Sequence, residues 1–334
     1  MILHEDKALF AEVILRASQP KENGGIGINA AFIEKDYWIT RALQQMSRSA
    51  AKDIAIFKGG TSLSKAYGIG ARFSEDVDIA VVRNESMTDA RMKTVIRSTE
   101  KAMSQGLTPI DRPGLTSKGS RYRKSYFIYP QVDGISPVGS MIPGQLLIEI
   151  NSFANPYPFE QHIIGSFILD YLRQNNYHDI ISEFDMGEFS INVLDKRTTM
   201  TEKLVSLIRF SLGTNYITEL TTKIRHFYDI HYLANDNDCR LYLDSNQFIA
   251  NFASLIQHDR AMFAKPDGWQ TRRINESPLI VEFDTVWAAL SHRYVTELPS
   301  LAYSGIPAKE DIADSSKYVL NKLDVNTLVS LKIC

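Results

Sequence analysis

Ile56-Phe57-Lys58-Gly59-Gly60-Thr61-Ser62-Leu63 and, a little later, Arg72-Phe73-Ser74-Glu75-Asp76-Val77-Asp78-Ile79 are the stretches that decide the fold of this chain. The apolar run 54–57 ends at a glycine pair, which predicts a strand followed by a turn and a short helix. The second stretch continues as Ile79-Ala80-Val81-Val82, which is typical of a buried strand. Residues 54–82 are therefore expected to form a βαβ-like unit.

This unit carries groups suited to phosphate chemistry. Thr61 or Ser62 can cap the expected helix, whose first N–H groups offer a site for phosphate. Asp76 and Asp78 are two residues apart, so on a strand both carboxylates point to one face. Convergent carboxylates beside a phosphate site suit Mg²⁺-dependent phosphoryl or nucleotidyl transfer. Ser74 either bonds phosphate or merely closes the turn. A glycine pair alone is usually only a turn, but acids leading directly into a buried strand are harder to explain as solvated surface.

The composition argues against a strongly basic nucleic-acid-binding protein, a disulfide-bonded protein and a membrane-spanning protein. The 334 residues include 37 Lys and Arg against 39 Asp and Glu, a formal net charge of −2. Any contact with RNA or DNA must therefore come from local patches, and the basic stretches 91–97 and 118–124 are candidates or simply solvated faces. The two cysteines, Cys239 and Cys334, lack metal-ligand spacing. This indicates a cytoplasmic protein with reduced thiols, and no apolar run is long enough to span a membrane.

The order of elements predicts two domains. Helices are expected over 4–17, 30–47 and 89–105, and strands over 122–130, 144–152 and 190–194. From residue 198 onward the pattern is helical almost to the end of the chain. We therefore expect an α/β domain over residues 1–160 and a mostly helical domain over residues 161–334.

Glu149 interrupts the apolar run Leu146-Leu147-Ile148-Glu149-Ile150. A buried acid is costly unless it is paired or bound to a metal, so Glu149 is a candidate for a third metal-binding carboxylate. The alternative is an acid on a half-exposed face, with its two isoleucine neighbours facing the core. The residues leave these two interpretations equally open.

Two later segments add charged candidates. Thr199 and Glu202 have the spacing of a capping box, which predicts a helix beginning there. Lys203 would then lie in the first helical turn, against the helix dipole, and this position suggests that it meets a negative group such as a triphosphate. Arg225 and Asp229 stand at i and i+4, where a surface ion pair is the simplest interpretation.

Together these blocks resemble the AbiEii/MenT family of nucleotidyltransferase toxins, within the DNA polymerase β-like superfamily. The resemblance rests on the Gly-Gly and Asp-x-Asp unit, the strand acid Glu149, Thr201-Glu202-Lys203-Leu204 and Arg225-His226-Phe227-Tyr228-Asp229. Phe32-Ile33-Glu34-Lys35-Asp36-Tyr37-Trp38 also looks like the segment that precedes the family's motif. The resemblance covers roughly residues 30–235, and residues 236–334 match no motif.

The resemblance implies an α/β (α+β) fold, with a polymerase β-like domain on a mixed sheet followed by a mostly helical C-terminal domain. It implies a toxin of a type IV toxin–antitoxin or phage-defence system that transfers a nucleotide from an NTP to RNA. The expected acceptor is the 3′ end of tRNA, the expected effect a block of translation, and the expected partner an antitoxin encoded nearby. Asp76, Asp78, Lys203 and Asp229 would be catalytic, with Mg²⁺ or Mn²⁺ on Asp76, Asp78 and Glu149. The expected nucleotide-binding residues are Gly59, Gly60, Thr61, Ser62, Lys65, Ser74 and Arg225.

Two other functions remain open at this stage. The same site serves equally for transfer to a small molecule or a protein side chain, and the mildly acidic net charge favours such an acceptor over tRNA. A non-catalytic module that only binds a nucleotide is the third possibility. The chain has the full set of charged motif residues, which argues against a protein that has lost its catalytic activity.

Overall fold

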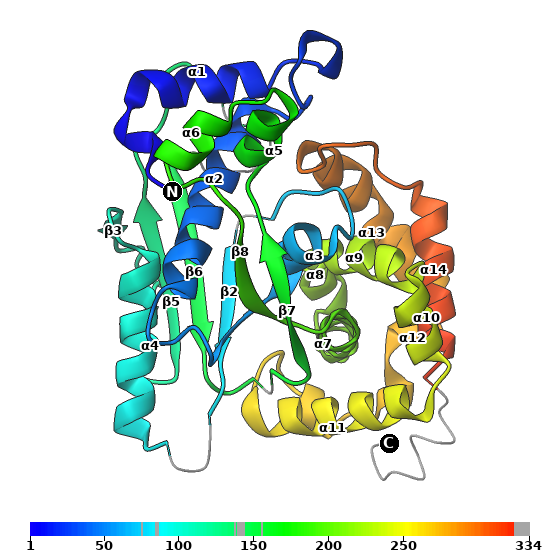
Figure 1. Cartoon of the computed structure of the whole chain (residues 1–334). Helices are drawn as coiled ribbons and strands as arrows, with labels where there is room; N and C mark the ends of the chain where they lie inside the picture. The colour runs from blue at the N-terminus through cyan, green and yellow to red at the C-terminus, as the bar shows by residue number, and fades with distance from the viewer. Residues whose placement is uncertain (75, 84–86, 137, 139–143, 155, 324–334) are drawn as a thin grey trace. The chain divides into compact units, whose positions relative to one another are not determined.

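The computed structural model describes the chain except residues 75, 84–86, 137, 139–143, 155 and 324–334 (Figure 1). Its contacts separate the chain into two compact units. The first comprises Met1–Gly68 and Arg72–Leu194, and the second comprises Ile69–Ala71 and Asp195–Cys334. The contacts thus divide after Leu194, whereas the sequence predicts a domain boundary at residue 160. Residues between these two positions form strands of the first unit's sheet and the helices beside them.

The first unit is built on a mixed sheet, to which the described residues contribute eight strands. The strands are β1 (Ala55–Lys58), β2 (Asp76–Val81), β3 (Thr108–Ile110), β4 (Ser117–Lys118), β5 (Tyr122–Ile128), β6 (Gln145–Asn151), β7 (Phe159–Ile164) and β8 (Phe189–Leu194). Their order is β3-β5-β6-β2-β1-β8-β7, with β4 paired to β5. β2 runs parallel to β6 and β1 runs parallel to β8, while the other neighbours are antiparallel.

The predicted order of strand, short helix and strand over residues 54–82 is confirmed, but β1 and β2 pair antiparallel, unlike the strands of a true βαβ unit. The connecting helix α3 (Gly59–Tyr67) has only 9 residues. A parallel crossover generally needs a dozen or more residues, usually a longer helix lying across the sheet. The short helix instead lets the chain turn back beside β1.

The two faces of the sheet differ in burial. Alternate residues of β2 and β6 are buried, namely Val77, Ile79, Ile148 and Ile150. The helices α2 (Ala30–Ser47) and α4 (Asp89–Met103) contact β6 and each other. The intervening residues of these strands are half-buried at the start of β2 and all along β6. One face of the sheet therefore forms the core, while polar groups occupy the other.

Three further helices complete the first unit. They are α1 (Lys7–Ala17), α5 (Phe167–Gln174) and α6 (His178–Glu183), with short 3₁₀ turns at Leu3–Glu5 and Lys21–Asn23. α1 and α5 contact α2 and each other, and α6 contacts α5 (Figure 1). Buried aromatic rings line the contact between α1 and α2, since the ring centroids of Phe10 and Tyr37 are 4.7 Å apart.

The second unit is helical. Its helices are α7 (Lys196–Ser211), α8 (Tyr216–Thr221), α9 (Ile224–Ala234), α10 (Asn237–Leu243), α11 (Asn246–Met262), α12 (Pro278–Val281), α13 (Phe283–Glu297) and α14 (Lys309–Asn321), with 3₁₀ turns at Trp269–Thr271, Ile274–Glu276 and Leu298–Ser300. α7 contacts α8, α9, α10, α11 and α12, and Figure 1 shows it nearly end-on among them. Most of its apolar residues are buried, so α7 is the core helix of this unit.

The expected fold class, a mixed α/β sheet structure followed by helices, is confirmed. The second helix coincides with the prediction for residues 30–47, and α4 ends two residues early, at Met103. The sequence did not predict β7, α5 and α6. β7 reads Phe-Glu-Gln-His-Ile-Ile, which has neither a continuous apolar run nor strict alternation.

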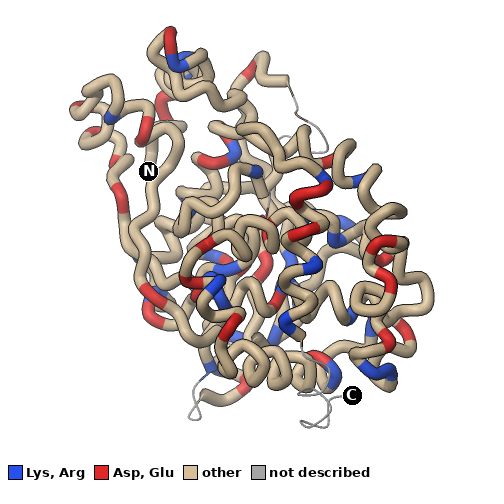
Figure 2. The backbone as a smooth tube through the Cα atoms, turned by 90° about the vertical axis from the view of Figure 1, so that its right-hand side faces the viewer, with Lys and Arg blue, Asp and Glu red and all other residues tan. Residues whose placement is uncertain are grey.

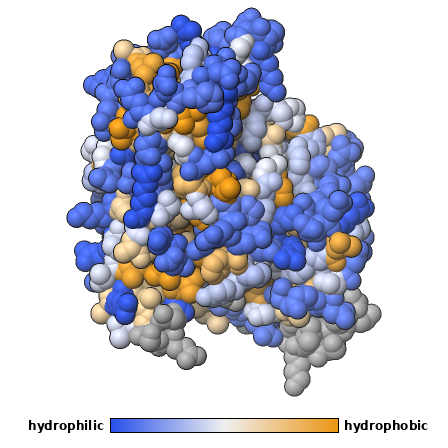
Figure 3. All heavy atoms as spheres, in the orientation of Figure 1, coloured by the Kyte–Doolittle hydropathy of each residue, from blue (hydrophilic) through white to orange (hydrophobic). Residues whose placement is uncertain are grey.

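Charges of both signs are interspersed along the backbone (Figure 2). The face seen in Figure 3 is mostly hydrophilic, with scattered apolar patches. Among the described helices, none combines the length and the apolar character needed to cross a lipid bilayer.

Glu34 provides a test of the buried core of the first unit. Its residue is 2 % exposed, and its Oε1 accepts a hydrogen bond of 2.6 Å from the backbone N–H of Val132. Burial raises the pKa of the Glu34 carboxyl to about 7, against the opposing effect of that hydrogen bond. Between the ordinary pKa of 4.5 and about 7, only the unfolded chain has lost this proton, so the free energy of unfolding falls as pH rises.

We therefore expect Glu34→Gln, which keeps the acceptor for Val132, to remove this loss. Its free energy of unfolding relative to the wild type should rise by about 3 kcal/mol between pH 4.5 and 8. Urea unfolding of both proteins across this range measures the difference. If the free energies of unfolding of the two proteins changed in parallel with pH, folding would not raise the pKa of Glu34, and the prediction would be wrong.

Candidate active site

A row of charged side chains crosses four neighbouring strands of the first unit. Asp78 on β2 is in register with Lys58 on β1 and with Glu149 on β6. Glu149 is in turn in register with Lys124 on β5. Residues that pair across strands project from the same face, and Asp76 joins them two residues before Asp78. The register therefore gathers three carboxylates on the half-buried face of the sheet.

The N-terminus of α3 lies against this row. Gly59 has a φ of +82°, and a Cβ added there would be 2.3 Å from Oδ2 of Asp78. Only glycine accepts both this left-handed backbone and so close a carboxylate. The N-cap residue of α3, Lys58, makes no side-chain capping hydrogen bond. The first N–H groups of α3, with the positive end of the helix dipole, lie beside Asp78 and are of the kind that binds anions.

The predicted caps of α3 are wrong, because the helix begins at Gly59 and both hydroxyl residues lie inside it. The Thr61 hydroxyl donates to the carbonyl of Asp76 at 2.5 Å. The Ser62 hydroxyl donates to the carbonyl of Gly59 at 2.8 Å. Both hydroxyls thus fix the corner between α3 and β2, and contacts of these residues with a nucleotide stay predictions.

Arg72 and Ser74 approach the second glycine. A Cβ on Gly60 would be 2.6 Å from Nη2 of Arg72 and 3.4 Å from Oγ of Ser74. Arg72 is only 5 % exposed. A guanidinium at a helix N-terminus suits phosphate binding, because its fork of donors matches phosphate oxygens. Arg72 was not among the predicted site residues, although its place in the Asp-x-Asp motif could have identified it. Glu75 of that motif lies outside the described residues.

Glu149 combines features of both interpretations left open by the sequence. It is half-buried, between the core residues Ile148 and Ile150, and it faces Asp78 on the neighbouring strand. Its carboxylate accepts a hydrogen bond of 2.7 Å from the Tyr122 hydroxyl and pairs with Nζ of Lys124 at 2.7 Å.

These contacts with Glu149 shift the pKa values of its two partners, Tyr122 and Lys124. Burial, the hydrogen bond to Glu149 and the charges of Glu149 and Asp78 all raise the pKa of Tyr122. Burial lowers the pKa of Lys124, but the hydrogen bond and charge of Glu149 outweigh it, so the pKa is raised overall. Tyr122 therefore stays neutral and Lys124 stays charged near neutral pH.

The carboxylates suit a hard cation such as Mg²⁺, which proteins usually bind through one or two carboxylates together with substrate phosphates. Asp76 and Asp78 provide such a pair on adjacent positions of one face. Within the described part of the chain, no three His, Cys, Asp or Glu side chains are grouped so that they could hold an ion. The donor set thus fits a two-carboxylate site that nucleotide phosphates would complete, and a role for Glu149 as third ligand stays a prediction.

Lys65, expected to bind nucleotide, lies in a buried ion pair. Its Nζ is 2.5 Å from Oδ1 of Asp36 and 3.1 Å from the carbonyl oxygen of Gly165. Oδ2 of Asp36 also accepts a hydrogen bond of 2.9 Å from the N–H of Phe167. These contacts tie α3 to α2 and to the start of α5, which favours a structural role for Lys65.

The second unit contains another buried ion pair. Nζ of Lys203 on α7 is 2.7 Å from Oδ2 of Asp229 on α9, and their side chains are 7 % and 5 % exposed. Removing either partner would take this ion pair from a buried charge, which is destabilising. These two residues, 26 positions apart in sequence, are therefore joined within one unit, and the catalytic role expected for each stays a prediction.

The predicted start of α7 is wrong. The helix begins at Lys196, and the carboxylate of Asp195 caps it by accepting a hydrogen bond of 2.7 Å from the N–H of Arg197. Thr199 and Glu202 therefore do not form a capping box. Lys203 lies in the middle of the helix, where the dipole argument does not apply. Its proximity to Asp229, and not the dipole, explains its place.

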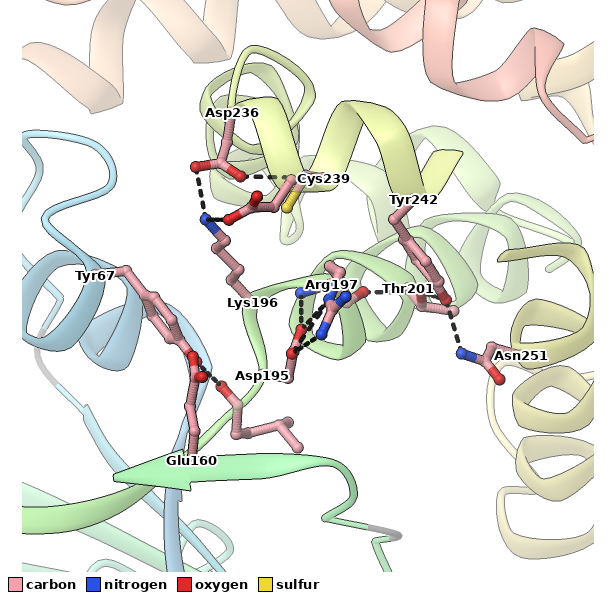
Figure 4. Close-up of polar contacts among 12 residues, drawn as sticks. Tyr67, Glu160, Asp195, Lys196, Arg197, Thr201, Asp236, Cys239, Tyr242 and Asn251 are labelled. Carbon is pink, nitrogen blue, oxygen red and sulfur yellow. Dashed lines mark hydrogen bonds and ion pairs between the residues drawn. The ribbon is translucent and has the colours of Figure 1, made fainter. Parts of the chain in front are cut away.

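Polar contacts hold the first turns of α7 to α10 and α11 (Figure 4). Nζ of Lys196 is 2.8 Å from Oδ2 of Asp236. The hydroxyls of Thr201 and Tyr242 are 3.1 Å apart, and Asn251 donates to Tyr242 at 2.9 Å. This network fixes the helix that carries Lys203, and the sequence did not predict it because its members are distant along the chain.

Arg225, also expected to bind nucleotide, contacts a different acid from the one predicted. Its Nε is 3.1 Å from Oε1 of Glu297 on α13. The pair at i and i+4 with Asp229 was the simplest interpretation of the sequence, but Asp229 is the partner of Lys203. Arg225 thus links α9 to α13, and a nucleotide contact stays a prediction.

The close approach of Gly59 to Asp78 can be tested by stability. Gly268 in the second unit has nearly the same φ, +80°, but a Cβ there meets nothing within 4 Å. Gly59→Ala and Gly268→Ala share the backbone strain, of about 1–2 kcal/mol, and only the first adds a clash with the carboxylate. We expect Gly59→Ala to lower the free energy of unfolding by about 1–3 kcal/mol more than Gly268→Ala.

Urea unfolding of both variants measures this excess. In a protein that already carries Asp78→Ala, Gly59→Ala should cost no more than Gly268→Ala, since no carboxylate would remain to clash. Equal costs for both glycine variants, with no coupling to Asp78, would contradict the packing described here.

Comparison with known proteins identifies the family. The family model described as "Nucleotidyl transferase AbiEii toxin, Type IV TA system" matches residues 41–315. One similar solved structure is MenT4, the nucleotidyltransferase toxin Rv2826c from Mycobacterium tuberculosis H37Rv, at 16 % identity and a TM-score of 0.48, covering 95 % of this chain and 98 % of that one.

Another is a putative nucleotidyltransferase from H. pylori, at 13 % identity and a TM-score of 0.42, covering 90 % of this chain and 97 % of that one. No curated protein sequence matches the chain. The family model spans most of the chain, including both aspartates of β2 and the Lys203–Asp229 pair. The chain therefore belongs to the AbiEii family of nucleotidyltransferase toxins of type IV toxin–antitoxin systems.

Proposed function

We propose that this nucleotidyltransferase toxin transfers a nucleotide from an NTP to the 3′ end of tRNA, in an Mg²⁺-dependent reaction that blocks translation. The observation that carries the proposal is the position of Asp76 and Asp78 beside the glycine-rich N-terminus of α3. Carboxylates for a cation and N–H groups for phosphate are the two components that such a transfer needs side by side.

In this reaction the 3′ oxygen of the RNA bonds to the α-phosphorus of the NTP. The bond from that phosphorus to the oxygen bridging to the β-phosphate breaks, pyrophosphate leaves, and the hydroxyl proton passes to a base or to solvent. Asp76 and Asp78 would hold Mg²⁺. When bound, the ion would neutralise charge on the transferring phosphate and lower the pKa of the attacking hydroxyl.

Other residues of the first unit would hold the triphosphate. The first N–H groups of α3 and the Arg72 guanidinium are grouped around Gly60, where a side chain would exclude a phosphate. Ser74, at the same glycine, adds a hydroxyl donor. These donors would hold the leaving pyrophosphate in position, so that the carboxylates remain available to bind the metal ion.

Lys203 would neutralise charge on the triphosphate, as lysines do in other phosphoryl-transfer sites. Asp229 would hold the Lys203 ammonium in one position, through the 2.7 Å contact. Pre-positioned charge is effective because no reorganisation is needed during the reaction.

The acceptor is supported by the sequence resemblance and by the cationic residues near the carboxylates, above all Lys124 on β5. A nucleotide added to the 3′ end of tRNA would block the hydroxyl that accepts the amino acid. Family membership implies an antitoxin partner, and we propose that this antitoxin is encoded nearby and that the toxin acts in the cytoplasm, where NTPs and tRNA are found.

Transfer of label from each α-³²P-labelled NTP to total tRNA tests the proposal. The wild type should label tRNA only with Mg²⁺ or Mn²⁺ present, and Asp78→Asn should label it at least about 100-fold more slowly. Asp53→Asn, a change at an exposed acid, is the matched control and should retain full activity. Label on a protein or small molecule in place of RNA, or NTP binding without turnover, would refute the proposed acceptor or the proposed catalysis.

The Lys203–Asp229 pair requires a separate variant, because its loss affects stability as well as chemistry. Lys203→Met should lower kcat/KM by about 100-fold or more and also destabilise the protein, because the buried Asp229 carboxylate loses this ion pair. The double variant Lys203→Met/Asp229→Asn removes the charge of that carboxylate as well, so it should recover the urea midpoint without recovering activity. Recovery of activity along with stability would mean that the pair is only structural.

A further inference from the structure

The half-buried face of the sheet continues beyond the carboxylates onto β5. Register aligns Tyr126 on β5 with Leu147 on β6, and Leu147 with Asp76 on β2. One step along the strands, Lys124 is aligned through Glu149 with Asp78. Neighbouring strands are about 4.8 Å apart, so β5 lies roughly 10 Å across the sheet from the two aspartates.

From Lys124 onward, the side chains of β5 alternate in burial. Ser125 and Phe127 are buried, while Tyr122, Lys124 and Tyr126 are half-buried. The hydrogen bond of Ser125 to Glu100 of α4 shows that the buried side chains face that helix. The two tyrosines and Lys124 therefore project on the opposite face, the same one as the carboxylates.

Cations accompany these rings. The Arg112 guanidinium lies 5.3 Å from the ring centroid of Tyr126, and its Nη2 donates to Oε1 of Gln145 at 2.6 Å. The hydrogen bond fixes the guanidinium beside the ring. Lys124 neutralises Glu149 at 2.7 Å, which removes the repulsion that this carboxylate would exert on a phosphate.

This pattern matches the chemistry of single-stranded nucleic acid. Tyrosine faces on an open sheet stack bases, and arginines beside them contact the sugar–phosphate backbone. Tyr122 and Tyr126 are four residues apart on one strand, about 13 Å, so they can stack on two bases that are not adjacent in the RNA. A hydrophobic partner is less suited to this face, because Lys124, Gln145 and Glu149 interrupt it.

We propose that Tyr122, Lys124, Tyr126 and Arg112 form a platform for the last unpaired nucleotides of the RNA acceptor. The proposal rests on the function proposed above and deepens it, by placing the acceptor strand on β5 and β6. Bases stack on the two tyrosines, Arg112 contacts a backbone phosphate, and the strand's terminal hydroxyl is directed across β6 toward Asp76 and Asp78.

The test measures RNA binding and NTP use separately. The probe is a fluorescein-labelled single-stranded RNA oligonucleotide with a free 3′ hydroxyl, titrated by fluorescence anisotropy, and the NTP KM is measured with tRNA as acceptor. Tyr126→Leu should weaken RNA binding by about 5- to 100-fold and leave the NTP KM unchanged. Tyr126→Phe, which keeps the ring, should bind like the wild type.

Two further variants sharpen the test. Tyr157→Leu replaces a tyrosine that is 51 % exposed elsewhere in the first unit and should bind RNA like the wild type. Arg112→Gln should weaken binding and lower the slope of log Kd against log salt concentration by roughly one. Urea midpoints of all variants confirm that they are folded.

Three results would overturn the platform. The first is unchanged RNA binding by the folded variants Tyr126→Leu and Arg112→Gln. If the wild type still transferred a nucleotide to tRNA, this result would refute only the platform and leave the proposed function supported. A raised NTP KM with unchanged RNA binding would assign the rings to the nucleotide's base. A wild type that neither binds nor labels RNA would remove the RNA acceptor and the platform together.

Discussion

Pairing of β2 with β1 on one side and β6 on the other is the constraint on which the candidate site depends. It aligns Lys58, Asp78 and Glu149 in one row. A slip of one residue would turn Asp76 and Asp78 into the core and expose Val77 and Ile79. Both apolar residues are fully buried, so the core itself maintains the register that presents the carboxylates. Stability and chemistry thus depend on the same alternation along β2.

The second constraint is the close approach of α3 to β2. Gly59 and Gly60 allow Asp78, Arg72 and Ser74 to pack against a helix N-terminus where any side chain would intrude. The Thr61 hydroxyl fixes this corner by donating to the backbone of Asp76. The glycine pair therefore brings a positive helix end, a guanidinium and a carboxylate into a small volume. In the second unit, the ion pair between Lys203 and Asp229 fixes the position of the Lys203 ammonium.

Local patterns were sufficient to predict much of this arrangement. The glycine turn, the two aspartates on one strand face and the bounds of α2 all follow from residues close together in sequence. The direction of β1 relative to β2 did not follow, because it depends on a crossover length that the motif alone does not show. The start of α7 was misplaced because Thr199 and Glu202 imitate a cap, while the actual cap is Asp195.

Side-chain partners were the least predictable part of the site. Lys65 pairs with Asp36, and Arg225 with Glu297, across separations of 29 and 72 residues that no local spacing reveals. The same holds for Glu149, whose partners Tyr122 and Lys124 lie on β5, 27 and 25 positions away in the printed sequence. The sequence indicated which groups were chemically important, and the tertiary fold determined which charges each of them meets.

Asp76, Asp78 and the N-terminus of α3 are proposed above to bind one metal–nucleotide complex. A crystal structure with Mn²⁺ and a non-hydrolysable NTP analogue tests it most directly, through the anomalous signal of the metal. We expect a metal peak beside the carboxylates of Asp76 and Asp78, with the triphosphate of the analogue at Gly60 beside Arg72. A metal peak away from both carboxylates, or a nucleotide bound elsewhere in the chain, would contradict it.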